Sequence, residues 1–290
     1  MHRKLPATAV VLAVALMSGC GAAARTADPA AGASDVAGVG VASGAVLPAG
    51  SQSSLASPTA SPSPSPPALP LAGRVVGIDP GHNGGNFSDP GYINQLIWNG
   101  RESETCDTTG TQTASGFTEA SFNFAVASDL RADLIAAGAK VVMTRQDNTS
   151  VGPCVTTRAQ ILNDAHADVA IDIHADGGPT WGRGFTVLEP VADGPNDAVI
   201  SSSAQFGADV RDAVLRDTPM PESNYYGTDG LITRDDLAGL NLTTVPKVLV
   251  ECGNMPNSTD AGMLADPAFQ QQLARAFTAA IMVFLTGKAG

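Results

Sequence analysis

The chain has 290 residues and a formal net charge of −12 at pH 7, and this length is sufficient for one substantial hydrophobic core. Such an acidic chain is not expected to bind nucleic acid or to be attracted electrostatically to anionic lipid. We therefore expect a partner that is neutral, mixed in charge or held through a metal ion.

Residues 1–19 have the pattern of an export signal. A short basic region precedes an apolar stretch, residues 7–16, that is too short to span a bilayer as a helix. Small residues then precede Cys20, and this ending resembles the lipobox of bacterial lipoproteins. We therefore expect an exported lipoprotein on the outer face of the cytoplasmic membrane, with lipid on Cys20 as its only membrane contact. An ordinary secretory signal, which would give a secreted protein, is the alternative.

Residues 20–72 consist mainly of Ala, Gly, Ser and Pro, with few charges and little aromatic or branched apolar material. Such a segment cannot bury enough apolar surface to offset the entropy lost on ordering, so it is expected to be a disordered tether. Alternating Ser and Pro from Ser57 to Pro67 favours an extended polyproline conformation in its distal part. Residues 73–290 are then the folded domain.

The domain alternates strand-like and helix-like segments. Strands are predicted at 74–78, 140–144, 169–174, 184–188 and 247–251, and helices at 118–137, 156–165, 198–216 and 267–285. In the first helix, Phe122, Val126, Leu130 and Leu134 recur every four residues, and Gly138 follows its end. The alternation predicts a single α/β domain of phosphorylase/hydrolase-like type, with a mostly parallel twisted sheet flanked by helices.

Three further cysteines follow Cys20 in the chain. Cys106 and Cys154 lie in polar, loop-like sequence, whereas Cys252 follows an apolar run and is expected to be buried. Because an exported protein can retain disulfides, we expect Cys106 to pair with Cys154, although the other pairings stay open. On the chain-entropy model, closing a loop of this length would stabilise the domain by about 4 kcal/mol.

Four side chains that can carry chemistry lie at the ends of predicted elements. His82 follows the first predicted strand, and His174 lies at the end of the third. Glu119 lies in the first turn of the first predicted helix, and Glu251 closes the last strand. Because the carboxyl ends of parallel strands meet at one edge of a sheet, we expect these four side chains to converge there.

Two imidazoles and one carboxylate with an open fourth position are typical of catalytic zinc, whereas structural zinc usually has four protein ligands. We therefore expect one zinc ion at His82, Glu119 and His174, with Glu251 as the carboxylate that accepts and returns a proton. Asp172 shares strand parity with His174, so it either orients that histidine or is solvated. Each residue alone has a plainer explanation, such as a hydrogen-bonded loop histidine or a carboxylate favoured by the helix dipole.

These segments together resemble a known family. The segments Val76–His82, Ile171–Asp176 and Val248–Asn254, together with Glu119 at the start of a helix, are similar to the zinc-dependent N-acetylmuramoyl-L-alanine amidases of the amidase_3 family. The general pattern is similar to that of mycobacterial and other actinobacterial cell-wall amidases. The resemblance extends from Gly73 to about Leu285, and the four ordered motifs are far more specific jointly than singly.

The resemblance implies that His82, Glu119 and His174 bind zinc and that Glu251 is the catalytic glutamate. The implied reaction is hydrolysis of the amide between N-acetylmuramic acid and the L-alanine of the peptidoglycan stem peptide. We also expect the protein to be a monomer. Asp172 stands where many relatives have serine, which adds negative charge near the metal. Asp79 precedes a proline-glycine turn and is given no role at the metal.

Two other functions are alternatives to this reaction. A zinc peptidase acting on peptidoglycan peptides would share the metal chemistry, and only its products would distinguish it. A non-catalytic, peptidoglycan-binding surface lipoprotein would need no Glu251 beside a full ligand set.

Overall fold

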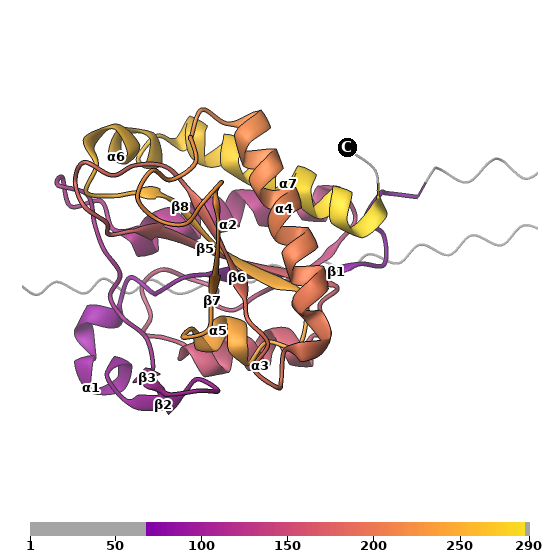
Figure 1. The fold of residues 1–290 in the computed structure, drawn as a ribbon, viewed down its shortest axis with the longest axis horizontal. Helices are drawn as coiled ribbons and strands as arrows, with labels where there is room; N and C mark the ends of the chain where they lie inside the picture. Colours follow the sequence, from indigo (N-terminus) through magenta and orange to yellow (C-terminus); the bar gives the residue numbers. More distant parts are fainter. Residues whose placement is uncertain (1–67, 288–290) are drawn as a thin grey trace, which may run out of the picture. The chain divides into compact units, whose positions relative to one another are not determined.

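Six strands form the central sheet in residues 68–287, the part of the chain that the computed structural model describes (Figure 1). They are β1 (Val75–Pro80), β4 (Lys140–Met143), β5 (Val169–Asp176), β6 (Thr186–Pro190), β7 (Leu231–Arg234) and β8 (Lys247–Asn254). Their order across the sheet is β4-β1-β5-β8-β6-β7. Only the β6–β8 pair is antiparallel within this sheet. The mostly parallel sheet predicted from the sequence is therefore confirmed.

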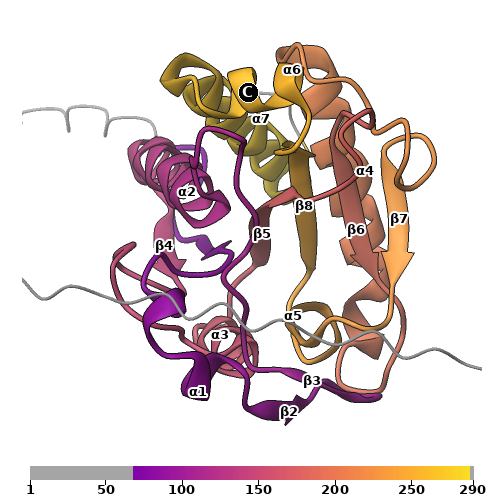
Figure 2. The same cartoon turned by 90° about the vertical axis from the view of Figure 1, so that its left-hand side faces the viewer.

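Helices lie on both faces of this sheet. One face is covered by α2 (Glu119–Ala136), α4 (Ile200–Asp217) and α7 (Pro267–Thr286), which enclose the main apolar core. The other face carries α3 (Val155–Asp164) and α5 (Ala238–Asn241), each with a smaller apolar cluster (Figure 2). The structure thus confirms the predicted α/β class with flanking helices.

The alternation of side chains along the strands gives the two faces different chemistry. Ile78 of β1 and Ile171 of β5 lie in the main core. Their neighbours Asp79 and Asp172 therefore point to the face of α3 and α5, and both are buried there. This second face of the sheet contains buried charges as well as apolar side chains.

The long predicted helices and strands are observed with their ends shifted by a few residues. Several short elements are missing from the sequence prediction because they contain too few residues for a periodic apolar pattern. They are η1 (Asn86–Ser88), α1 (Pro90–Ile93), β2 (Leu96–Trp98), β3 (Ser103–Thr105), η2 (Asp197–Val199), α6 (Ser258–Leu264), and the already named β7 and α5. The strands β2 and β3 form a separate antiparallel pair within the segment between β1 and α2.

The folded part begins before the boundary predicted at Gly73. Leu71 is fully buried in the main core, and its backbone N–H donates to the carbonyl of Ala137 at 2.9 Å. The predicted export signal, Cys20 and the tether as far as residue 67 lie outside the described residues. Among the described helices, none has the length and apolar character needed to cross a membrane.

Candidate active site

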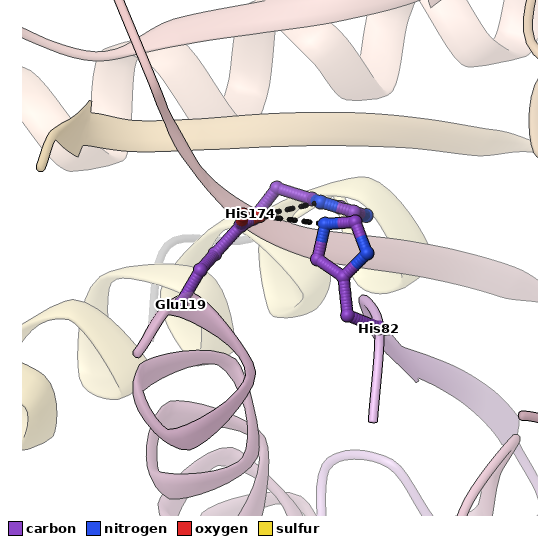
Figure 3. A group of neighbouring side chains, drawn as sticks. All are labelled: His82, Glu119 and His174. Atoms are coloured by element: carbon purple, nitrogen blue, oxygen red, sulfur yellow. Dashed lines mark hydrogen bonds and ion pairs between the residues drawn. The ribbon is translucent and has the colours of Figure 1, made fainter. Parts of the chain in front are cut away.

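The ends of β1 and β5 bring His82 and His174 together at one edge of the sheet (Figure 3). Their ring centroids lie 4.8 Å apart, with the ring planes at 85°. Gly81 makes this approach possible, because a Cβ at that position would lie 2.2 Å from the His174 ring. His82 itself has a φ of 56°, a left-handed conformation that is uncommon outside glycine and often found at functional sites.

Glu119 completes this group from the first turn of α2. Thr118 caps the N-terminus of this helix, and its side chain accepts a hydrogen bond from the Ser121 N–H. The Glu119 Oε1 atom lies 3.1 Å from His82 Nε2 and 2.8 Å from His174 Nδ1. One ligand atom from each of these three side chains lies within 4.8 Å of the others, so the group could hold a metal ion.

The charges of this group favour a cation. Burial lowers the pKa of His82, but the negative charge of Glu119 and hydrogen bonds to Asp107 and Glu119 outweigh it and raise that pKa to about 9. Burial also opposes the charged form of His174, yet its carboxylate neighbours raise its pKa well above the usual value. Because metal ions bind neutral imidazole, a metal would displace these protons while supplying the positive charge that the site favours. The donor set therefore fits a divalent metal.

Glu251 lies on β8 in register with His174 on β5. Its Oε2 is buried and, within residues 68–287, has no hydrogen-bond partner. Burial raises the pKa of Glu251 to about 8, and the carboxylates of Glu119 and Asp176 act in the same direction. A carboxyl group that titrates near neutral pH is suited to exchanging a proton during a reaction.

One cleft contains all four of the predicted residues. A cavity of about 340 Å³ is lined by His82, Glu119, His174 and Glu251, and also by Asp176, Arg234 and others. Asp176 accepts a hydrogen bond of 2.6 Å from the hydroxyl of Tyr225. The structure thus brings the four predicted side chains to the same edge of the sheet.

Each histidine has an aspartate at its other ring nitrogen. Asp172 Oδ1 lies 3.3 Å from His174 Nε2, which is the neighbour expected from strand parity. Asp107 Oδ1 lies 3.2 Å from His82 Nδ1. Asp107 is not among the residues singled out from the sequence, because it lies in an irregular segment where no periodic pattern or motif marks it.

The two cysteines expected to pair are neighbours, but the predicted disulfide is not formed in the structure. Cys106 and Cys154 are both buried free thiols. Burial and the adjacent Cys154 thiol raise the pKa of Cys106 to about 12. Cys252 is fully buried, as predicted.

The raised pKa of Glu251 predicts a pH-dependent stability difference in metal-free protein. Its folded-state pKa of about 8 exceeds the ordinary value of 4.5. The contribution of Glu251 to the free energy of unfolding is therefore fully present below pH 4.5 and is lost as the pH rises through 8. Glutamine does not ionise, so the Glu251→Gln variant does not lose this stability as the pH rises. We expect the melting temperature of the variant, relative to the unsubstituted protein in chelator, to increase across this pH range. A difference that is constant with pH would contradict the raised pKa.

Comparison with known proteins gives the family of this chain. The family model described as N-acetylmuramoyl-L-alanine amidase, Amidase_3, matches residues 76–283. The chain is 39% identical over 222 residues to an N-acetylmuramoyl-L-alanine amidase of Mycobacterium tuberculosis, with 74% of this chain and 88% of the relative covered.

Two crystal structures of the N-acetylmuramyl-L-alanine amidase Ami1 are also similar. The Mycobacterium smegmatis structure has a TM-score of 0.71 and 39% identity and covers 75% of this chain and 99% of its own. The Mycobacterium abscessus structure, an apo form, has a TM-score of 0.70 and 39% identity. This match covers 74% of the present chain and 100% of the M. abscessus chain. The fold, the converging side chains and these matches show that the chain belongs to the Amidase_3 family of N-acetylmuramoyl-L-alanine amidases.

Proposed function

We propose that this protein is a zinc-dependent peptidoglycan hydrolase that cleaves the amide bond between N-acetylmuramic acid and the L-alanine of the stem peptide. The observation that carries the proposal is the convergence of His82, Glu119 and His174, with Glu251 in register with His174 in the same cleft. Membership of the amidase family supports the muramyl amide as the bond that is cleaved. Because all four side chains come from one chain, the proposed catalytic unit is a monomer.

The proposed ligands of a single zinc ion are His82 through Nε2, Glu119 through a carboxylate oxygen and His174 through Nδ1, the atoms that face one another. Three such ligands leave an open position, as in catalytic zinc sites. Zinc in that site would polarise the substrate carbonyl and make a water molecule more acidic.

The proposed role of Glu251 is to transfer one proton. Its carboxylate accepts the proton of the attacking water as the new carbon–oxygen bond forms. The same carboxyl group then donates this proton to the amide nitrogen, so that L-alanine leaves as a neutral amine when the carbon–nitrogen bond breaks. A cation in the neighbouring site would lower the pKa of Glu251 from about 8, because positive charge favours the ionised form.

Product analysis tests this assignment. Muropeptides incubated with the zinc-loaded chain should yield free stem peptides whose new amino terminus is L-alanine, together with peptide-free muramyl sugars, as measured by mass and by labelling of amino groups. Cleavage inside the peptide would instead identify a zinc peptidase. Saturable binding of muropeptides without any product would identify a non-catalytic peptidoglycan-binding protein.

We also propose that the chain is exported and anchored by lipid. In this scheme, residues 1–19 are the signal, supported by the sequence pattern around Cys20. The tether predicted at 20–72 joins the catalytic domain before Leu71, whose side chain is already buried in the core. Metabolic labelling with an alkyne-tagged fatty acid should mark the unsubstituted chain but not Cys20→Ala. Release of the unsubstituted chain into the medium without lipid would identify an ordinary secreted protein.

We further propose that Cys106 and Cys154 form a disulfide in the oxidising environment outside the cell. Their burial side by side supports this pairing. In oxidised protein, reduction should add about 2 Da and lower the melting temperature, since the loop closure is worth about 4 kcal/mol on the chain-entropy model. The Cys252→Ala variant should respond in the same way. Two freely alkylated thiols at Cys106 and Cys154 under oxidising conditions would contradict the pairing.

A further inference from the structure

Lys247 is a buried lysine to which the proposed reaction assigns no role. It begins β8 on the face of the sheet that carries α3 and α5, and its side chain is only 1% exposed. Its Nζ lies 2.8 Å from Asp79 Oδ2 and 3.1 Å from Asp172 Oδ2. Burying a lysine is costly even when it is paired, and an apolar side chain would often serve stability as well. The position therefore suggests a task other than stabilising the fold.

The two aspartates at Lys247 are direct neighbours in the sheet. Asp79 of β1 is in register with Asp172 of β5. Two carboxylates opposite each other on adjacent strands repel, and burial strengthens this repulsion. The ammonium group of Lys247 contacts one oxygen of each, so it can hold both carboxylates in place.

On one side, Asp172 connects Lys247 to His174. Asp172 uses Oδ2 for Lys247, and its Oδ1 lies 3.3 Å from His174 Nε2. This contact is an ion-pair distance and not a formed hydrogen bond, because Asp172 Oδ1 has no hydrogen-bond partner within residues 68–287. In the metal-free site, His174 Nδ1 donates to Glu119 at 2.8 Å. A negative charge beside Nε2 favours a proton on that atom once a cation takes the lone pair of Nδ1. Such carboxylate contacts fix the tautomer and the ring orientation of metal-binding histidines.

On the other side, Lys247 is connected to His82 through Asp79, through Arg158 on α3 and through Asp107. Asp79 Oδ1 lies 3.1 Å from Arg158 Nη1, and Arg158 Nη2 lies 3.2 Å from Asp107 Oδ2. Asp107 in turn lies 3.2 Å from His82 Nδ1. This contact leaves Nε2 of His82 free to face Glu119, so the two histidines present different ring nitrogens to the metal site.

We propose that Lys247 is a positioning residue, which aligns both histidines for metal binding through the charged chain His174–Asp172–Lys247–Asp79–Arg158–Asp107–His82. The inference rests on the proposed metal site, although its consequences can be measured without turnover. It also gives Asp79 a role, whereas the sequence interpretation assigned one only to Asp172.

Lys247→Met tests the proposal, because methionine keeps much of the length but not the charge. The full chain carrying this change should bind zinc about 10- to 100-fold more weakly in competition with a chelator, the range typical of lost outer-shell partners. Lys140→Met is the matched control, since Lys140 is an exposed strand lysine in β4, and its zinc affinity should not change. Equal affinity of the Lys247→Met and unsubstituted proteins would overturn the proposal.

A double variant separates positioning from stability. Lys247→Met with Asp79→Asn removes one buried positive and one buried negative charge but leaves Asp172 beside His174, so it should melt closer to the unsubstituted protein than Lys247→Met does. If Lys247 positions the histidines, the double variant still binds zinc at least about 10-fold more weakly. Recovery of full zinc affinity together with the fold would show a purely structural role and contradict the proposal.

Nitrogen NMR of metal-free protein tests the positioning role of Lys247 independently of the proposed catalytic function. The unsubstituted chain should show one set of ring-nitrogen resonances for His174 and one for His82, as expected for rings held in fixed orientations, with His166 as an internal reference. Lys247→Met, or the double variant if the single one does not fold, should show several sets of resonances or broadened resonances at His174. If the unsubstituted protein binds no zinc, the proposed function fails, and unaltered His174 resonances in the variants then overturn the positioning role separately.

Discussion

Glu251→Gln is expected to lower kcat by about 100- to 10,000-fold, the range attributed to a positioned general base. Glutamine has nearly the same shape but cannot accept the proton of the attacking water or return it to the departing amine. Glu251 is not one of the proposed ligands, so the variant should keep one zinc ion per chain. Turnover of muropeptide and metal content should be measured on the same preparation.

The control for this substitution is Glu102→Gln. Glu102 is exposed and lies outside the residues that line the cleft, so its replacement should leave kcat unchanged. Activity of the Glu251→Gln variant close to that of the control would show that another group exchanges the proton. Loss of zinc from Glu251→Gln would instead make Glu251 a ligand.

His174→Ala is expected to abolish activity by removing a zinc ligand. Loss of an outer-shell partner typically costs about 10- to 100-fold in metal affinity, and loss of a direct ligand should cost more. The unsubstituted protein should lose activity in chelator and regain it with added zinc, whereas the variant should not regain it at the same zinc concentration. Metal content after dialysis and initial rates of muropeptide cleavage measure the two effects.

His166→Ala is the matched control for the histidine. His166 lies just after α3 and is not part of the group that could hold a metal. Its replacement should leave both zinc content and rate unchanged. A His174→Ala variant that retains zinc and activity would place the metal elsewhere.

The long elements and the convergence of the four site residues follow from local patterns. The apolar spacing of Phe122, Val126 and Leu130 predicts α2, and that helix carries Glu119 to the sheet edge. The apolar runs before His174 and Glu251 predict parallel strands, whose carboxyl ends must lie together. These features can be predicted because they depend on the apolar pattern within each segment and on the rule that parallel strands end at the same edge of a sheet.

The charged chain behind the histidines could not be predicted in the same way. Lys247 looks like the polar start of a buried strand, and its partners Asp79 and Asp172 become evident only from the register of β1, β5 and β8. Asp107 contacts His82 from an irregular segment. The sequence of that segment has no periodic apolar pattern from which the orientation of the Asp107 side chain could be predicted. Contacts of this kind depend on tertiary packing, which the sequence pattern does not encode locally.

The central claim is that one metal ion bound by this chain enables cleavage of the muramyl–alanine amide. It is tested most directly by titrating zinc into metal-free protein while measuring the release of stem peptides with an L-alanine amino terminus. The account predicts no release without metal, a linear rise up to one equivalent of zinc and a plateau beyond it. Full release by the metal-free protein, or release only of fragments cut within the peptide, would contradict it.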